Sequence, residues 1–147
     1  MNKPIYYLIA FIVGLVIAAH LAMNADVGEK IGNPRAGNAV FWVIGAIVAV
    51  IIWLASANRS AIKEITNVNP LLLLAGALGA GMVLVIAIII PKIGAGSTNV
   101  LMLAGQVIAG IVIGHLGIWG SAVEPITALK MVGVVIMVGG AYMAVTF

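Results

Sequence analysis

The chain has 147 residues, of which 64% are hydrophobic and 7% are charged, whereas an ordinary soluble domain is about 45–50% apolar and about 25% charged. Four acids and seven bases are too few to cover a water-exposed surface, while a lipid-facing surface needs no such cover. The composition excludes a water-soluble globule and predicts an all-α integral membrane protein. The absence of cysteine excludes disulfides and thiolate metal sites, and the scattered bases form no nucleic-acid footprint.

Five apolar stretches approach the roughly 20 residues that a helix needs to cross a bilayer. They predict one transmembrane domain, residues 1–147, with spans at about 4–24, 37–57, 71–90, 99–119 and 126–147. We expect the first to be a retained span and not a cleaved signal peptide, because no A-x-A site follows it. Its end stays open, since the helix could stop near Asn24 or continue until Gly32.

The later spans carry local start and stop signals. Asn33-Pro34 and Asn69-Pro70 each combine an N-cap with a first-turn proline and predict the starts of the second and third spans. We expect Pro91-Lys92 to close the third span and residues 93–98 to form a flexible connector. Glu124-Pro125 is expected to open the fifth span, with Glu124 near the positive end of the helix dipole.

Small residues recur at close-packing spacing in the last three spans. Because lipid provides no hydrophobic driving force between helices, such residues let helix backbones approach one another. The expected helix-packing positions are Gly76, Gly79, Gly110, Gly114 and Gly117. The alternative is that a missing side chain makes room for a substrate.

The charges are divided almost evenly between the two faces of the membrane, because five spans place the chain ends on opposite sides. One face carries Lys3, Arg59, Lys63 and Lys130, and the other carries Lys30, Arg35 and Lys92. Under the positive-inside rule this split barely sets an orientation. A chain that inserts both ways suits an antiparallel homodimer, which reproduces the inverted-repeat architecture of alternating-access transporters. The alternative is a weakly biased protein with a single topology.

Polar side chains inside a membrane are costly and are functional candidates by default. Five of them are candidates for a substrate path: His20, Asn24, Asn38, Gln106 and His115. His20 and Asn24 are four residues apart and share a helical face, so the alternative is a hydrogen-bonded pair that only fixes packing. Gln106 falls near the middle of the fourth span, and the alternative for His115 is an interfacial position.

No carboxylate lies securely within a span, so a neutral, zwitterionic or anionic cargo fits better than a cation exchanged for protons. The sequence also has no phosphate-binding loop, no HExxH motif, no nucleophile elbow and no paired carboxylates. We therefore expect no enzymatic activity, no cofactor and no metal site.

Several short motifs keep a recognisable order along the chain. They are Asn24-Ala25, Gly32-Asn33-Pro34, Gly105-Gln106 and His115-Leu116-Gly117. Over essentially its whole length the chain resembles the YdcZ-type branch of the drug/metabolite transporter superfamily. That family usually has glutamine where His20 stands and aspartate where Gly114 stands, so this chain lacks the one intramembrane acid of the pattern.

The resemblance implies a ten-helix arrangement made of two five-helix chains, similar in organisation to small multidrug resistance proteins. Together with the charge split, it predicts a secondary transporter of a small metabolite or drug-like molecule. The transporter would act by alternating access as a dual-topology homodimer in the lipid bilayer of a bacterial-type cytoplasmic (inner) membrane. The alternatives are a flippase for a lipid or lipid-linked headgroup, and a non-transporting accessory subunit.

Overall fold

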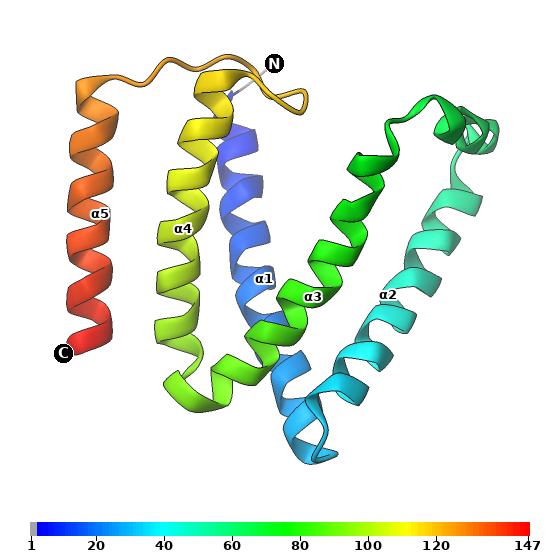
Figure 1. Ribbon diagram of the computed structural model, residues 1–147, viewed down its shortest axis with the longest axis horizontal. Helices are drawn as coiled ribbons and strands as arrows, with labels where there is room; N and C mark the ends of the chain where they lie inside the picture. Colours follow the sequence, from blue (N-terminus) through cyan, green and yellow to red (C-terminus); the bar gives the residue numbers. More distant parts are fainter. Residues whose placement is uncertain (1–2) are drawn as a thin grey trace. The chain divides into compact units, whose positions relative to one another are not determined.

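The computed structural model describes residues 3–147 and is helical throughout those residues apart from short connections (Figure 1). The elements are α1 (Lys3–Lys30), α2 (Pro34–Ala55), the 3-10 helix η1 (Arg59–Asn67), α3 (Pro70–Ile93), α4 (Ala95–Leu116) and α5 (Ala128–Thr146). Each of the five α-helices is long and apolar enough to cross a membrane, which confirms the prediction of five spanning helices. The helices form two compact units, a first unit up to Lys92 and a second unit from Ile93, which are described separately.

The α1 helix of the first unit continues past Asn24 to Lys30, which settles the open end of the first span. Gly32, at φ 66°, takes the left-handed conformation that ends helices, and the Asn33 amide donates to the Gly28 carbonyl at 2.9 Å. The Asn33 side chain then accepts from the amides of Arg35 and Ala36. The predicted helix start at Asn33-Pro34 is therefore confirmed, and α1 and α2 form a tight hairpin.

Two glycines bring the backbones of α1 and α2 together beside this hairpin turn. A Cβ added to Gly37 would lie 2.8 Å from the Gly28 Cα, and one added to Gly28 would lie 2.9 Å from the Pro34 Cα. From this contact the two helices diverge along their length (Figure 1). Gly28 and Gly37 are not among the packing positions predicted from the sequence.

The α3 helix begins where predicted, since the Leu71 amide donates to the Asn69 side chain at 3.0 Å. The expected stop at Pro91-Lys92 is wrong, because α3 includes Pro91 and ends at Ile93. Proline removes only one backbone donor, and near a helix end several carbonyls lack partners in any case. Residues 59–67, between the second and third predicted spans, form η1.

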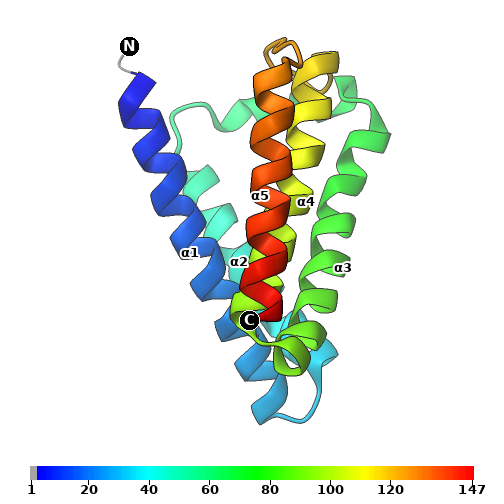
Figure 2. The same ribbon diagram turned by 90° about the vertical axis from the view of Figure 1, so that its left-hand side faces the viewer.

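The second unit pairs α4 with α5, which lie side by side in both views (Figures 1 and 2). The expected connector at residues 93–98 is wrong, because α4 already begins at Ala95, after Gly94 at φ 82°. Thr98 and Asn99 donate to the carbonyls of Gly94 and Ala95 at 2.7 Å each. These polar side chains are thus satisfied within the first turns of the helix.

The α4–α5 connection corrects two further boundaries. Gly117, at φ 61°, caps α4 in the left-handed conformation, so the helix ends at Leu116 and not near residue 119. The fifth helix does not open at Glu124-Pro125, because Thr127 is its N-cap and accepts from the Lys130 amide at 3.2 Å. The Glu124 amide donates instead to the Gly114 carbonyl at 2.8 Å, which holds the connector against the end of α4.

Candidate functional site

A groove of about 180 Å³ lies between α1 and α2, beside the point where their backbones meet. Its walls are His20, Met23, Asn24, Val27, Gly37, Val40, Phe41 and Ile44. The groove exists because the helices touch at the glycines and separate above them. Apart from His20 and Asn24 its walls are apolar, so these two side chains decide what hydrogen bonds the groove can offer.

His20 is half-buried and its ring is fixed from two sides. The ring stacks on Phe41 of α2, with centroids 5.3 Å apart and planes inclined by 27°. Its Nδ1 lies 2.8 Å from the Ile17 carbonyl, and because a carbonyl can only accept, Nδ1 is the protonated nitrogen of this contact. In the tautomer with the proton on Nδ1, Nε2 is the acceptor.

Asn24 is the most unusual polar residue of the first unit. It is 3% exposed, and within residues 3–147 neither its amide nitrogen nor its amide oxygen has a hydrogen-bond partner. A buried polar group without a partner costs about 1–3 kcal/mol. Asn24 therefore carries both a donor and an acceptor that the described chain leaves unused.

Asn38 is the second buried amide of this region, 8% exposed. Its Nδ2 donates to the Ala80 carbonyl of α3 at 3.2 Å, whereas its Oδ1 has no partner in the described part of the chain. The side chain thus ties α2 to α3 and does not line the groove. The neighbouring contact of the Trp42 ring with Gly79, 3.5 Å from an added Cβ, joins the same two helices.

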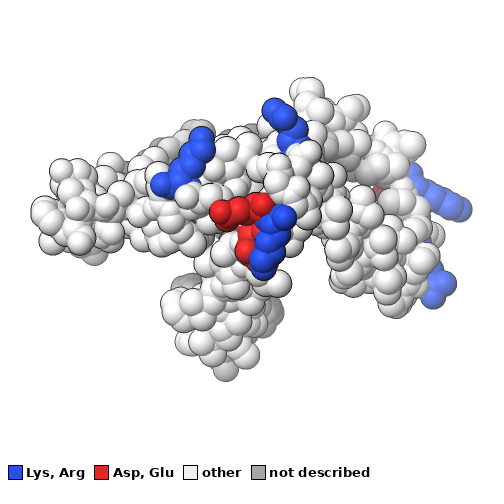
Figure 3. Space-filling view, turned by 90° about the horizontal axis from the view of Figure 1, so that it is seen from below, with Lys and Arg blue, Asp and Glu red and all other residues white. Residues whose placement is uncertain are grey.

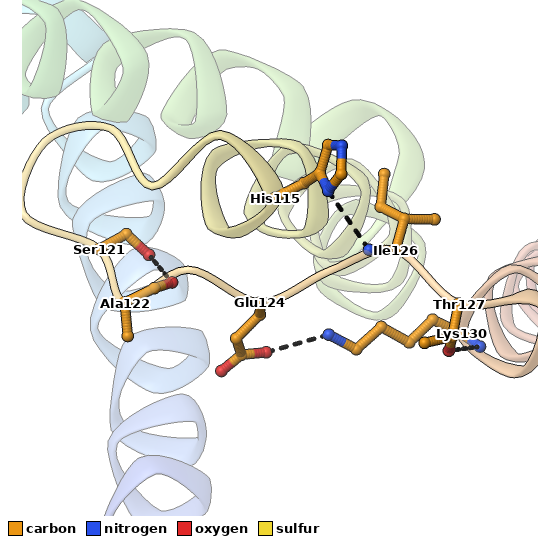
Figure 4. A network of polar contacts seen from close by, with 7 residues as sticks. All are labelled: His115, Ser121, Ala122, Glu124, Ile126, Thr127 and Lys130. Atoms are coloured by element: carbon orange, nitrogen blue, oxygen red, sulfur yellow. Dashed lines mark hydrogen bonds and ion pairs between the residues drawn. The ribbon is translucent and has the colours of Figure 1, made fainter.

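The other two candidates for the substrate path belong to the second unit. Gln106 lies on α4 with its side chain exposed. His115, also exposed, accepts from the Ile126 amide at 3.3 Å through Nδ1 and so helps to hold the α4–α5 connector (Figure 4). Substrate contact by either residue stays a prediction.

A second groove, of about 310 Å³, lies between α4 and α5. Gly110, Gly114 and Gly133 form part of its wall, and an ion pair between Glu124 and Lys130, 3.2 Å long, also lines it (Figure 4). This groove was not expected from the sequence, in which Glu124 is assigned to the first turn of the fifth helix. The carboxylate instead reaches forward from the connector to a lysine on α5.

The glycines predicted to pack helices have different surroundings. Gly114 lies 3.7 Å, measured from an added Cβ, from the Glu124 side chain, and Gly117 caps α4. An added Cβ at Gly76 or Gly110 would meet no atom within 4 Å in residues 3–147. Packing at these last two positions stays a prediction.

Five apolar spanning helices with few intramembrane polar groups define a multi-pass membrane protein. The sequence model of the family described as "Putative inner membrane exporter, YdcZ" matches residues 5–143, and the chain belongs to this family. The family places the protein in the inner membrane and indicates a transporter, which is consistent with the absence of catalytic motifs. No curated protein and no solved structure matches the chain.

Proposed function

We propose that this protein is a secondary exporter that moves a small neutral, zwitterionic or anionic molecule by alternating access, as an antiparallel homodimer of dual topology. His20 and Asn24 contribute hydrogen bonds to the substrate path in the groove between α1 and α2. The observation that carries the proposal is the buried Asn24 amide, which has no partner in the described chain and belongs to the wall of this groove.

The free energy that the unpaired Asn24 amide costs is the reason to consider it a ligand contact. The two polar atoms of the Asn24 amide are buried without a partner in the described chain, so this unused donor and acceptor lower the stability of the fold. Polar groups kept in spans at such a cost are characteristic of substrate and ion pathways. A ligand that pairs with Asn24 recovers this free energy on binding, which favours Asn24 as a contact residue.

The charge of the groove supports the choice of cargo. Its walls contain no Asp, Glu, Lys or Arg, and the contact with the Ile17 carbonyl uses the Nδ1 of His20 as a donor. A cation would meet no carboxylate there, so binding rests on hydrogen bonds and on the flat surface of Phe41. A neutral molecule, or one whose charges stay outside the groove, satisfies these conditions.

The dimer is supported by the near-even distribution of bases between the two faces. Four bases on one side and three on the other give only a weak bias toward one orientation during membrane insertion. Two copies inserted in opposite senses form an inverted pair around a two-fold axis in the membrane plane. Such a pair provides the two symmetric halves that alternating access requires.

The test asks whether the groove is filled with water in the membrane. The chain has no native cysteine. The single thiol introduced by Val40→Cys, in the groove wall, therefore reports the water accessibility of the groove without background from other thiols. Ala39→Cys is the matched control, because it is the adjacent position on α2 and is exposed like Val40 but lies outside the groove wall.

Thiols react with methanethiosulfonate reagents only where water ionises them. We expect the cysteine at position 40 to react at least about tenfold faster than the one at position 39, since a thiolate is strongly disfavoured in an apolar environment. Equal rates, or no reaction at either position as in a lipid-filled flippase groove, would contradict an aqueous substrate path.

A further inference from the structure

A third pocket, of about 330 Å³, lies at the hairpin end of the first unit. Glu29 of α1 and Lys92 of α3 belong to its lining, and Pro34, Ala87, Ile88 and Pro91 provide apolar wall between them. Since α1 and α3 both end here, the pocket is at a boundary of the membrane. Figure 3 views this end and shows acidic and basic side chains close together on it.

Glu29 is placed against the preference of its own helix. It lies in the last turn of α1, where the negative end of the helix dipole disfavours a carboxylate. The lysine nearest in sequence, Lys30, is already bonded to Asp26 at 2.6 Å. Within residues 3–147 no basic side chain forms an ion pair with Glu29. Positions that break a local rule often have a function, which makes Glu29 a candidate for binding a cation from outside the chain.

Lys92 has the opposite charge and a favourable position in the last turn of α3. Within residues 3–147 the ion pairs are Lys30 with Asp26 and Lys130 with Glu124, so Glu29 and Lys92 line one pocket without pairing with each other. The pocket thus offers a carboxylate and an ammonium group that are held apart by apolar surface.

We propose that this pocket binds the headgroup of a zwitterionic phospholipid with a primary ammonium group. Lys92 contacts the phosphodiester, Glu29 accepts from the ammonium, and the apolar wall contacts the glycerol region. An anionic lipid would leave Glu29 facing negative charge. A choline lipid carries a quaternary ammonium that has no proton to donate to the carboxylate.

The experiment uses the full chain in nanodiscs made from equal amounts of phosphatidylethanolamine and phosphatidylcholine with identical acyl chains. Lipids that stay bound after release are counted by native mass spectrometry. We expect phosphatidylethanolamine to be retained about threefold to fivefold over phosphatidylcholine, the upper part of the range that an exposed ion pair provides. Glu29→Gln should abolish this preference, and Lys92→Gln should reduce the retention of both lipids.

Two charge-matched variants serve as controls outside the pocket. Glu64→Gln removes a carboxylate from η1, outside the pocket, and Arg35→Gln removes a base from the same end of the unit as the pocket. Neither should alter the lipid ratio. Equal retention of the two lipids by the unmodified protein would overturn the proposal, as would equal effects of Glu29→Gln and Glu64→Gln. Stronger retention of phosphatidylglycerol in a parallel experiment would likewise contradict the role of Glu29.

Discussion

The contact between Gly28 and Gly37 predicts a large difference between two glycine substitutions on the same helix. In Gly37→Ala the new Cβ would lie 2.8 Å from the Gly28 Cα and 2.9 Å from the Gly28 nitrogen. Both neighbours are backbone atoms, so no side chain can rotate away. To reach 3.4 Å, where ordinary contact begins, α1 and α2 would have to separate by about 0.6 Å.

Overpacking of this kind costs about 1–3 kcal/mol, while the change from glycine to alanine within a helix returns about 0.5–1 kcal/mol. We therefore expect Gly37→Ala to lower the free energy of unfolding by about 1 kcal/mol, within a limit of about 2.5 kcal/mol. Gly45→Ala is the control, since its Cβ would meet no atom within 4 Å in the described chain. It should raise the free energy of unfolding by about 0.5–1 kcal/mol.

The assay is reversible unfolding of the purified protein in mixed micelles, with increasing mole fraction of sodium dodecyl sulfate and helicity followed by circular dichroism. Gly37→Ala should unfold at a lower mole fraction than the unmodified protein, and Gly45→Ala at a higher one. If both variants shifted the midpoint equally, the close backbone contact would not exist in the folded protein, and the argument for the shape of the groove would fail with it.

Three further substitutions test the polar residues and the α4 cap by the same assay. Asn24→Ala should leave the free energy of unfolding unchanged or raise it, by up to about 1–3 kcal/mol, because it removes an unpartnered amide. Asn38→Ala should lower the free energy of unfolding by about 1 kcal/mol, because it removes the hydrogen bond to α3. A loss from Asn24→Ala as large as that from Asn38→Ala would show that the Asn24 amide is already paired. Gly117→Ala should destabilise the end of α4 by about 1–2 kcal/mol, because φ 61° strains any residue with a Cβ; an unchanged midpoint would argue against this cap. Glu124→Gln should change stability by less than about 1 kcal/mol, since its pair with Lys130 is largely exposed, and a larger loss would show that the pair is shielded in the membrane.

The spans were predictable because their signals are local. Apolar length identifies a spanning helix from composition alone, and the starts at Asn33-Pro34 and Asn69-Pro70 depend on a cap and a proline next to each other in the sequence. The grouping of His20 with Asn24 in one groove follows from their spacing of four residues. These features need no knowledge of the tertiary structure.

The wrong helix start at Glu124-Pro125, and the contacts that the sequence did not predict, depend on residues that are apart in the chain. Glu124 resembles a first-turn acid in the sequence. In the structure its backbone amide donates to the Gly114 carbonyl, and α5 begins only after its N-cap, Thr127. Gly28 and Gly37 gain their importance only when the hairpin turn brings α1 against α2. Glu29 and Lys92 are far apart in the chain, so no periodicity could have placed them in one pocket.

The most direct test of the proposed transporter is the orientation of the chain in the membrane. Ser60→Cys places a single thiol in η1, and Ile31→Cys places one in the α1–α2 turn, at the opposite end of the first unit. Intact cells are treated with a membrane-impermeant maleimide, and the fraction of each variant that reacts is compared with that after permeabilisation. The antiparallel homodimer predicts that about half of the copies react from outside at both positions. Complete reaction at one position with none at the other would show a single topology and contradict the account.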